Sequence, residues 1–375
     1  MAGRSLIARK PARPWRPAGG RRYSAADLSL IVVNYFSSNL TARAIESSHL
    51  ATSRPLQRIV VDNSGDEGEA SALESLPIDR LVRLPNNPGY GSAANAGADC
   101  ASGDLLIANP DIVFTPGSID RLAAALMTEK VGMAGPRFVW DQGGEWHLPP
   151  PARPSCRQEV ARLFAGWLPA AGRRWQRARR TERIEFWTRS SVSEVPVLSG
   201  ALLAIRREAF DDVGGFDPAF RLYFEEIDLA LRLRKRGWRV LHVPDAVCRH
   251  LYNQSAGRSA EARRFFLESE KRFLSKWYGP RSAERFFRWR RAVTGIEVPL
   301  GVSPHTFELS RARWLTELSP TADFASAAGL FHEGGTVTVP SEILDGWLGG
   351  DLYVRNTNLE TGRSAGVRVI QRRVP

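Results

Sequence analysis

Residues 105–114 read LLIANPDIVF, and this stretch decides the fold. The apolar run at its start has the length and character of a buried central strand. Pro110 cannot donate a hydrogen bond to a sheet and keeps Asn109 out of the helical region, so we expect the strand to end there. Asp111 then lies at the carboxyl end of a strand, the edge where open α/β sheets bind ligands. Because Asp also favours turns, this position alone leaves a turn and a ligand contact both open.

Composition sets the class of protein. The chain has 375 residues, 43% of them hydrophobic and 25% charged, as in an ordinary globular protein. Residues 1–26 are rich in Arg, Pro and Gly without the apolar core of a secretion signal, so we expect a disordered basic tail. The formal net charge of +12 favours polyanionic partners: nucleic acid, anionic lipid or a phosphorylated substrate. Cys100, Cys156 and Cys248 match no metal or redox spacing, and we expect free thiols in a reducing cytoplasm.

Strand-like and helix-like segments alternate through the first third of the chain. Apolar runs predict strands at 28–35, 56–62, 80–84 and 131–139, and a helix is expected at 116–130 with Thr115 as its cap and Pro116 at its first position. This alternation predicts a doubly wound α/β sheet, mainly parallel, with right-handed crossovers. Asp62 and Asp111 both follow strands, so we expect them at one crevice, which favours the ligand contact for Asp111.

A second motif lies at residues 223–229, which read YFEEIDL and open a predicted helix. Glu225 and Glu226 fall in its first turn, where the helix dipole favours anions. Asp228 stands four residues before Arg232, a spacing that suits an ion pair as well as a catalytic role. His250 follows the next predicted strand and can be a metal ligand or an ordinary strand-end histidine.

Acids at strand ends, a histidine and a basic chain together suit a phosphorylated ligand with a bound metal. Mg²⁺ and Mn²⁺ prefer carboxylate oxygens and are commonly completed by substrate phosphates, and a histidine ligand favours Mn²⁺. The chain contains no P-loop motif, and no dinucleotide-binding GxGxxG follows a strand. Kinase and dehydrogenase functions are therefore disfavoured.

Five short motifs follow one another in order. They are Asn34-Tyr35, VVDN at 60–63, the Asn-x-Gly pairs beginning at Asn87 and Asn95, Asn109-Pro110-Asp111, and FEEIDL at 224–229 with its later Arg and Gly-Trp. In this order they resemble glycosyltransferase family 2, a family of inverting enzymes, and most of all its rhamnosyltransferase-like members. The resemblance covers about residues 28–278. It implies the GT-A fold, a Rossmann-like nucleotide-binding fold with a mainly parallel sheet, over residues 27–294.

The resemblance also implies a role for each matched residue. The donor nucleotide would be bound by Asn34, Tyr35, Asp62, Asn95 and Asn109. A divalent metal, Mg²⁺ or Mn²⁺, would be bound by Asp111 and His250. Glu226 would take the proton of the acceptor, with Glu225 beside it and Asp228 as a further candidate. Two positions depart from the family pattern. Asn109 replaces the first Asp of the DxD motif, which removes one negative ligand. A Glu-Glu pair replaces Glu-Asp, so the choice of base among the three acids stays open.

The implied reaction transfers a sugar from a nucleotide-diphosphate sugar, dTDP-rhamnose or a UDP-sugar, to a hydroxyl of a glycan or lipid-linked acceptor. It would be a metal-assisted single displacement in polysaccharide biosynthesis of the cell envelope. We expect a cytoplasmic enzyme, free or held peripherally at the inner face of the plasma membrane, with no nucleic acid as partner. A sugar-phosphate nucleotidyltransferase would need a basic Gly-rich loop where residues 34–37 read NYFS. A non-catalytic binder of glycan or nucleic acid would show salt-sensitive binding without turnover of the sugar donor.

Three regions lie outside these motifs. Residues 141–194 are rich in Pro, Arg and Trp, and we expect an acceptor-side insertion, with Arg162, Leu163 and Trp167 either on a membrane-facing helix or in solvated short helices. The helical residues 259–291 mix aromatic and basic side chains, which suits a membrane or lipid-linked acceptor as well as packing against the sheet. Residues 298–375 show strand-like runs at 314–318, 336–339, 351–356 and 366–371, which predict a small all-β module for glycan binding, structure or oligomerisation.

Overall fold

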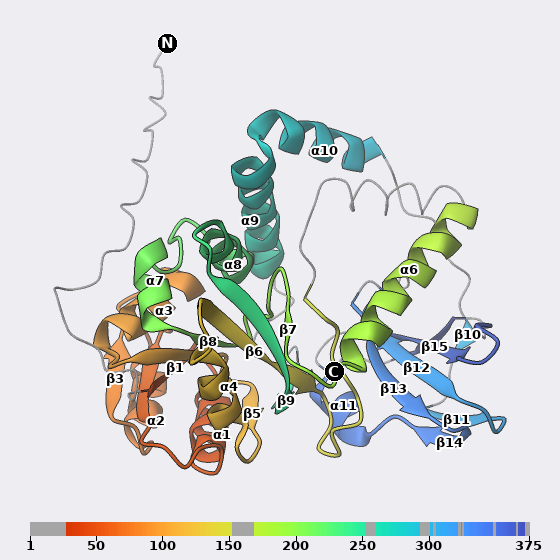
Figure 1. Ribbon diagram of the computed structural model, residues 1–375, viewed down its shortest axis with the longest axis horizontal. Coiled ribbons are helices and arrows are strands. Elements are labelled where there is room, and N and C mark those ends of the chain that lie inside the picture. Colours follow the sequence, from red (N-terminus) through yellow and green to blue (C-terminus); the bar gives the residue numbers. More distant parts are fainter. Residues whose placement is uncertain are drawn as a thin grey trace.

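The computed structural model of the chain is shown in Figure 1. It describes residues 28–151, 169–252, 260–292, 301–302, 305–321, 324, 326–347, 350–364 and 367–371. The expected basic tail at 1–26 and the expected helix around Arg162, Leu163 and Trp167 lie outside these residues, as does Cys156. Among the described residues, no helix combines the length and the hydrophobicity needed to cross a bilayer.

A nine-stranded sheet forms the centre of the N-terminal part, in the order β3-β2-β1-β4-β8-β6-β9-β5 with β7 paired to β9. The strands are β1 (Leu28–Asn34), β2 (Gln57–Asp62), β3 (Arg80–Arg83), β4 (Asp104–Ala108), β5 (Ile112–Phe114), β6 (Val131–Val139), β7 (Ser193–Glu194), β8 (Leu202–Ile205) and β9 (Arg239–His250). Strands β1 to β4 pair in parallel and β6 is parallel to β9, whereas β8, β5 and β7 pair antiparallel with their neighbours. The expected α/β fold with a mainly parallel sheet is confirmed.

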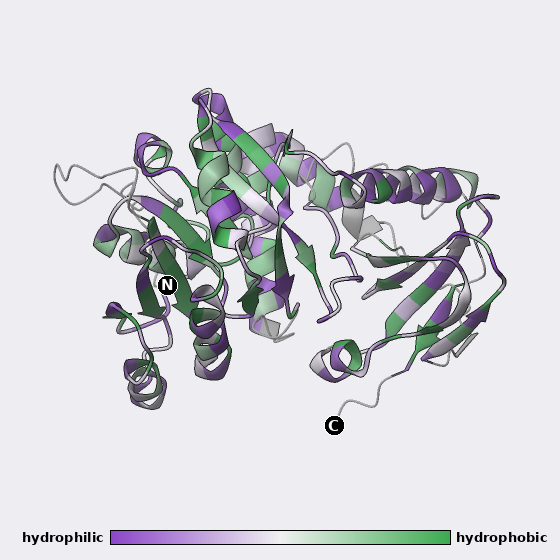
Figure 2. Ribbon diagram, turned by 60° about the horizontal axis from the view of Figure 1, so that its bottom comes forward, coloured by the Kyte–Doolittle hydropathy of each residue, from purple (hydrophilic) through white to green (hydrophobic). Residues whose placement is uncertain are grey.

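Helices cover both faces of this sheet (Figure 1). One face packs against α3 (Tyr90–Cys100), α7 (Arg207–Val213), α8 (Glu225–Lys235), α9 (Ala260–Tyr278) and α10 (Pro280–Ala292), and the other packs against α1 (Ser38–Ser48), α2 (Glu67–Glu74) and α4 (Ser118–Leu126). Along β1, Leu30 and Val32 point to the second layer while Ile31 and Val33 point to the first, the two-residue alternation of a strand. The central strands of the sheet are mainly hydrophobic, as Figure 2 shows.

Two element boundaries differ from the expectation for physical reasons. Helix α4 begins at Ser118, not at Pro116, because the Thr115 hydroxyl donates to the carbonyl of Val247 at 2.6 Å and therefore does not cap the helix. The helical segment expected at 259–291 is two helices, and Gly279, with φ of 87°, separates them. Helix α2 and the long helix α6 (Pro169–Trp187) lacked a clear sequence signal.

The C-terminal part contains a second sheet, which confirms the expected small β-module. The strands are β10 (Gly301–Val302), β11 (Thr306–Leu309), β12 (Trp314–Ser319), β13 (Ala328–His332), β14 (Gly335–Thr338), β15 (Leu352–Asn358) and β16 (Arg368–Ile370), and a helix, α11 (Ser341–Gly346), accompanies them. Five of the strands form one sheet, β10-β16-β15-β12-β13, and β11 pairs with β14.

The described residues of the expected insertion 141–194 pack mainly on this second sheet. Trp146 and Leu148 belong to the hydrophobic cluster of the C-terminal part. Helix α6 lies along the sheet, and its Arg183 bonds Glu317 on β12, which also accepts a 2.8 Å hydrogen bond from Arg355 Nε on β15. Because both Glu317 and Arg183 are buried, this paired network fixes α6 to the C-terminal sheet.

The close approach of α3 to the central sheet generates the first prediction. A Cβ atom on Gly97 would lie 2.5 Å from Cγ2 of Ile31 and 2.9 Å from Cγ2 of Val61. We expect Gly97→Ala to lose stability, because overpacking costs about 1–3 kcal/mol and the higher helix propensity of alanine returns only about 1 kcal/mol. Urea unfolding measures the difference. Ser92→Ala, half-buried on the same helix, serves as the control, and a Gly97→Ala protein as stable as wild type would contradict the packing argument.

Candidate active site

A cavity of about 360 Å³ opens at the carboxyl ends of four neighbouring parallel strands. Tyr35 follows β1, Asn63 follows β2, Asn87 follows β3 and Asn109 follows β4, and all four line the cavity. The opposite wall comes from residues 199–201, from residues 221–226 at the start of α8, from His250 and from the first turns of α9. Of the ten residues expected in the site, the cavity wall contains Tyr35, Asn109, Glu225, Glu226 and His250.

The two adjacent glutamates are presented by a strained turn. Tyr223 and Phe224 have φ angles of 69° and 68°, a left-handed conformation that costs of order 1–3 kcal/mol for each non-glycine residue. Their rings are held from the side of α9: both pack against Phe266, at centroid distances of 5.5 and 5.3 Å, and Phe224 also packs against Phe273. Helix α8 begins directly after this turn, so its first two residues face the cavity.

The environment of this acidic pair favours the protonated forms. Burial, followed by repulsion from Glu226, raises the pKa of Glu225 well above its ordinary value. Burial also raises the pKa of Glu226 to about 7, although hydrogen bonds from backbone N–H groups at the helix start oppose the shift. A carboxyl group with a pKa near 7 is suited to take up a proton at neutral pH. Gly200 leaves room for this side chain, since a Cβ there would lie 3.2 Å from Cβ and Cγ of Glu226.

Asp111 and His250 are brought together by the pairing of β5 with β9. Ile112 is the partner of His250 in this antiparallel ladder, and the backbone N–H of Leu251 donates to the carbonyl of Asp111 at 2.9 Å. The ladder places Nε2 of His250 3.3 Å from Oδ1 of Asp111. Asp111 is buried beneath the cavity wall, and His250 forms part of that wall.

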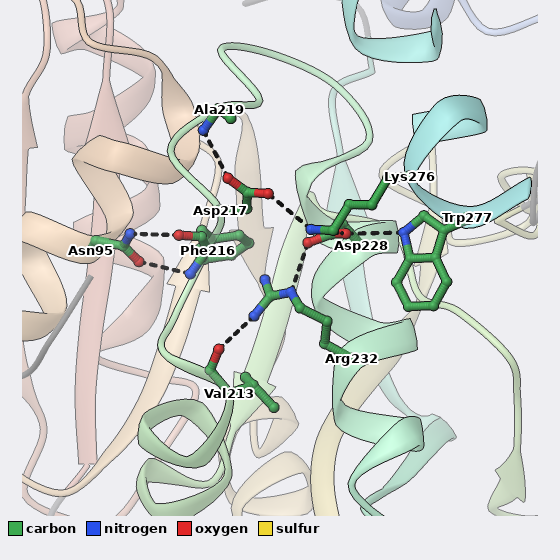
Figure 3. A network of polar contacts seen from close by, with 9 residues as sticks. All are labelled: Asn95, Val213, Phe216, Asp217, Ala219, Asp228, Arg232, Lys276 and Trp277. Carbon is green, nitrogen blue, oxygen red and sulfur yellow. Dashed lines mark hydrogen bonds and ion pairs between the residues drawn. The ribbon is translucent and has the colours of Figure 1, made fainter. Parts of the chain in front are cut away.

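Three expected nucleotide ligands lie behind the cavity wall and are engaged within the protein. Asp62 accepts hydrogen bonds from the backbone N–H and the hydroxyl of Ser64. Asn95 forms two 2.9 Å hydrogen bonds with the backbone of Phe216 (Figure 3). Asn34 donates from Nδ2 to Glu69 at 2.8 Å. Their contacts hold the loops after β1 and β2 and the segment before α8, so these residues support the wall of the cavity.

Asp228 is also removed from the cavity, on the far side of the first turn of α8. Oδ2 accepts a 2.7 Å hydrogen bond from Arg232, while Oδ1 is 2.7 Å from Nζ of Lys276 and accepts a hydrogen bond from the Trp277 indole at 3.0 Å (Figure 3). Fully buried and bonded by three donors, this carboxylate ties α8 to α9. It also fixes the helix that carries the glutamate pair.

Sequence reasoning missed several wall residues. Asn63 donates from Nδ2 to Oδ1 of Asn87 at 2.9 Å, and Oδ1 of Asn87 also accepts the backbone N–H of Gly89. Within the described residues, the buried Oδ1 of Asn63 has no hydrogen-bond partner, which leaves an acceptor available to a ligand. Tyr90 and Arg221 were missed as well. The available signal was position, because Asn63 directly follows Asp62 at the end of β2.

Comparison with known proteins identifies the class of protein. The family described as "Glycosyltransferase like family 2" matches residues 25–267. The protein is therefore a glycosyltransferase, and it belongs to glycosyltransferase family 2.

Individual relatives and solved structures are also similar to the chain. An N-acetylglucosaminyl-diphospho-decaprenol L-rhamnosyltransferase of Mycobacterium tuberculosis is 35% identical over 252 residues, which cover 62% of the chain and 78% of the relative, and this supports the resemblance to rhamnosyltransferase-like members. The O-antigen biosynthesis protein RfbC of Myxococcus xanthus is 28% identical over 75% of the chain and 21% of its own length. Among solved structures, a mannosyltransferase of Pyrobaculum calidifontis in complex with GDP-Man and Mn²⁺ aligns with a TM-score of 0.41 and 17% identity, over 76% of this chain and 80% of that one.

Glu69 on α2 generates a prediction for the loop after β1. Its carboxylate accepts hydrogen bonds from Asn34 Nδ2, from the backbone N–H groups of Ser37 and Ser38, and from the Ser38 hydroxyl, at 2.8–3.2 Å. Hydrogen bonds to a charged group contribute about 1.5–3 kcal/mol, so we expect Glu69→Ala to loosen the segment that carries Tyr35 and to raise the donor KM by about tenfold or more.

Steady-state kinetics with varied donor test this expectation. Glu67→Ala is the matched control, because Glu67 lies on the same helix with an 85% exposed side chain, paired only at the surface with Arg83. An unchanged donor KM in Glu69→Ala would show that the loop keeps its conformation without this carboxylate.

Proposed function

We propose that the protein is an inverting glycosyltransferase that transfers a sugar from a nucleotide-diphosphate sugar to a hydroxyl group of a glycan or lipid-linked acceptor. The observation that carries the proposal is a pair of adjacent glutamates, Glu225 buried and Glu226 half-buried, in the same cavity as the side chains at the carboxyl ends of four parallel strands. This arrangement provides a proton acceptor on one wall and polar groups for a nucleotide on the other. A single displacement needs one base and no covalent carboxylate, and it inverts the anomeric carbon.

The donor nucleotide is assigned to the wall formed by the ends of β1 to β4. Tyr35 offers an aromatic face that is 44% exposed, and Oδ1 of Asn63 offers an acceptor for an N–H group of a base. A uracil or thymine ring carries such an N–H at N3. We propose dTDP-rhamnose as the donor, in view of the rhamnosyltransferase named among the relatives, with a UDP-sugar as the alternative. Asn34, Asp62 and Asn95 act behind this wall by holding its loops.

A divalent cation on the donor diphosphate fits the residues beside it. In the described part of the chain, no group of three or more His, Cys, Asp or Glu side chains could hold a metal by itself. Asp111 and His250 supply one carboxylate and one imidazole 3.3 Å apart, and Mg²⁺ or Mn²⁺ is commonly completed by substrate phosphates. These two residues would hold the ion, with the amide of Asn109 nearby in the cavity wall. When bound, such an ion stabilises the negative charge of the departing diphosphate.

Glu226 is the proposed base. An acceptor hydroxyl is a weak nucleophile at neutral pH, and a carboxylate that removes its proton during attack accelerates such a step about 10²–10⁴-fold. The carboxyl group of Glu226 suits this role because its pKa is about 7. Gly200, which has no side chain, leaves space beside it. The more strongly shifted Glu225 is assigned to orienting the sugar or the base, and Asp228 is assigned to holding α8.

The acceptor side is assigned to the start of α9. Ala262 and Phe265 line the cavity there, and the neighbouring Phe266 and Leu267 are 40% and 39% exposed. Exposed basic residues occur along α9 and α10: Arg263, Arg264, Lys271, Arg272, Arg281, Arg285 and Arg288. Among them, Arg264 lies 3.6 and 3.8 Å from the carboxylates of Glu261 and Glu268. Apolar side chains next to cations suit a lipid-linked acceptor at an anionic membrane surface, so we propose peripheral contact with the inner face of the plasma membrane. The relative from M. tuberculosis carries such an acceptor in its name.

The role of Glu226 is tested by its amide. We expect Glu226→Gln to reduce transfer by at least about 10²-fold while donor binding persists, because the amide keeps the size of the side chain but cannot take a proton. Transfer from a panel of nucleotide sugars and donor binding by calorimetry provide the two measurements. Asp228→Asn serves as the comparison and should lose stability more than rate, since Asp228 is bonded by three donors. Full activity of Glu226→Gln would remove this residue from the mechanism.

The raised pKa of Glu226 predicts the dependence of the reaction on pH. The base must be ionised, so kcat/KM should rise with pH to a plateau above about 7. A kcat/KM that falls only below about pH 4.5, the ordinary pKa of a glutamate, would contradict the assignment of Glu226 as the base.

The same shift predicts a stability difference. The pKa of Glu226 is about 7 in the folded protein and has its ordinary value of 4.5 in the unfolded chain. The contribution of this group to the free energy of unfolding is therefore complete below about pH 4.5 and is lost as the pH rises through about 7. A neutral glutamine avoids this loss. We therefore expect the Tm of Glu226→Gln to exceed that of wild type at pH 8, with the gap closing at pH 4.

A further inference from the structure

Helix α11 of the C-terminal part contacts the last residues of β9, immediately beside His250. Its first turn carries Glu342, whose Oε2 is 2.6 Å from Nη2 of Arg249. Oε1 of Glu342 accepts the backbone N–H of Gln142 at 2.8 Å, and Nε of Arg249 donates to the carbonyl of Trp140 at 3.0 Å. The residue that precedes His250 is therefore fixed to α11 and to the end of β6 by charge-assisted hydrogen bonds.

On the other side of His250, Tyr252 is held by aromatic rings. The Tyr252 ring stacks on the ring of Trp347, the residue at the carboxyl end of α11, with 6.3 Å between the ring centroids. The centroid of Trp140 lies 5.6 Å from that of Tyr252. Trp140 and Trp347 also contact each other edge to face at 5.9 Å, and both are buried. The Tyr252 ring in turn meets the His250 imidazole edge to face at 5.6 Å.

The backbone shows that this packing holds a conformation that tyrosine disfavours. Tyr252 has φ of 39°, in the left-handed region, which is unfavourable for a residue with a side chain. Aromatic pairs stabilise a structure beyond the area they bury, and Tyr252 forms two such pairs with tryptophan. Loss of Trp347 would thus remove one of the two tryptophan rings that support the turn directly after His250.

We propose that helix α11 is a positioning element of the active site, which holds His250 beside Asp111 through the Glu342–Arg249 and Trp347–Tyr252 contacts. This gives the C-terminal module a role in the reaction that is independent of glycan binding. The inference rests on the proposed function where His250 acts on the metal and donor diphosphate. The position of the imidazole can be measured without that assumption.

The first experiment observes His250 directly. In protein with ¹³C-labelled histidine, the imidazole signal of His250 is assigned by its loss in His250→Gln. We expect Trp347→Ala to shift and broaden this signal, because the ring loses its fixed place against Tyr252, and Trp347→Phe to restore much of it by keeping an aromatic ring. Trp314→Ala is the matched control, since Trp314 lies on β12 of the same module and its indole donates to the carbonyl of Ser310.

The second experiment measures binding without turnover. Free Mn²⁺ is followed by electron paramagnetic resonance in the presence of dTDP. Removal of a residue that supports a metal ligand typically weakens affinity 10–100-fold, so we expect Trp347→Ala and Glu342→Gln each to weaken Mn²⁺ binding by about tenfold or more, with Trp314→Ala unchanged.

The two readouts separate the possible failures. An unchanged His250 signal in Trp347→Ala, with only a lower Tm, would overturn the positioning role and leave α11 as a structural element. A shifted signal with unchanged Mn²⁺ binding in both Trp347→Ala and His250→Gln would retain the positioning role and refute the metal assignment of the proposed function. A shifted signal that appears equally in Trp314→Ala would also overturn the inference, because the effect would then be general to the module.

Discussion

Two adjacent carboxylates at the start of α8, Glu225 buried and Glu226 half-buried, are the constraint on which the site depends. In a mobile loop, the carboxylates of Glu225 and Glu226 would move apart and become hydrated. The surrounding structure must therefore hold them together. The left-handed turn at Tyr223 and Phe224 aims them, and rings from α9 keep that turn in place. Asp228 then ties the same turn of helix to Lys276 on α9. Helix α9, which begins 34 positions after Glu226, is therefore part of the support of the glutamate pair.

The order of strands explains why the nucleotide side and the acid side face each other. Four neighbouring parallel strands end at one edge and supply Tyr35, Asn63, Asn87 and Asn109. Strand β8 runs against them, so the chain returns at this edge before β8 begins and leaves Gly200 there, next to Glu226. A purely parallel sheet would have carried this segment to the opposite edge. The reversal of β8 thus brings residues 199–201 to the edge that bears the cavity, where Gly200 packs against Glu226.

The sequence predicted the α/β fold and most strands, because buried parallel strands and Gly/Pro boundaries leave strong local patterns. Of the four residues that line the cavity from strand ends, it predicted Tyr35 and Asn109. The sequence did not predict that Asn63, and not the adjacent Asp62, lines the cavity. Which of two adjacent residues faces the cavity depends on the twist of the strand end. Nor did it reveal that Asn34 bonds Glu69 or that Asn95 bonds Phe216, because these are contacts between residues 35 and 121 positions apart. The role of α6 was hidden for the same reason: the arginines of the insertion suited either a membrane surface or solvent, whereas Arg183 is buried against Glu317.

Asn109 stands where the family pattern has the first Asp of the DxD motif, and this makes the contacts of the C-terminal module with the site important. With one carboxylate and one imidazole, the proposed cation site has less charge to hold an ion than a site with two carboxylates, so more of its affinity must come from fixed geometry. Asp111 is buried and set by the β5–β9 ladder, but His250 is the last residue of its strand and would fray if nothing followed it. The ring of Tyr252, held between Trp140 and Trp347, removes that freedom. A site that is poor in charge is in this way coupled to helix α11, which begins 91 residues after His250 along the chain.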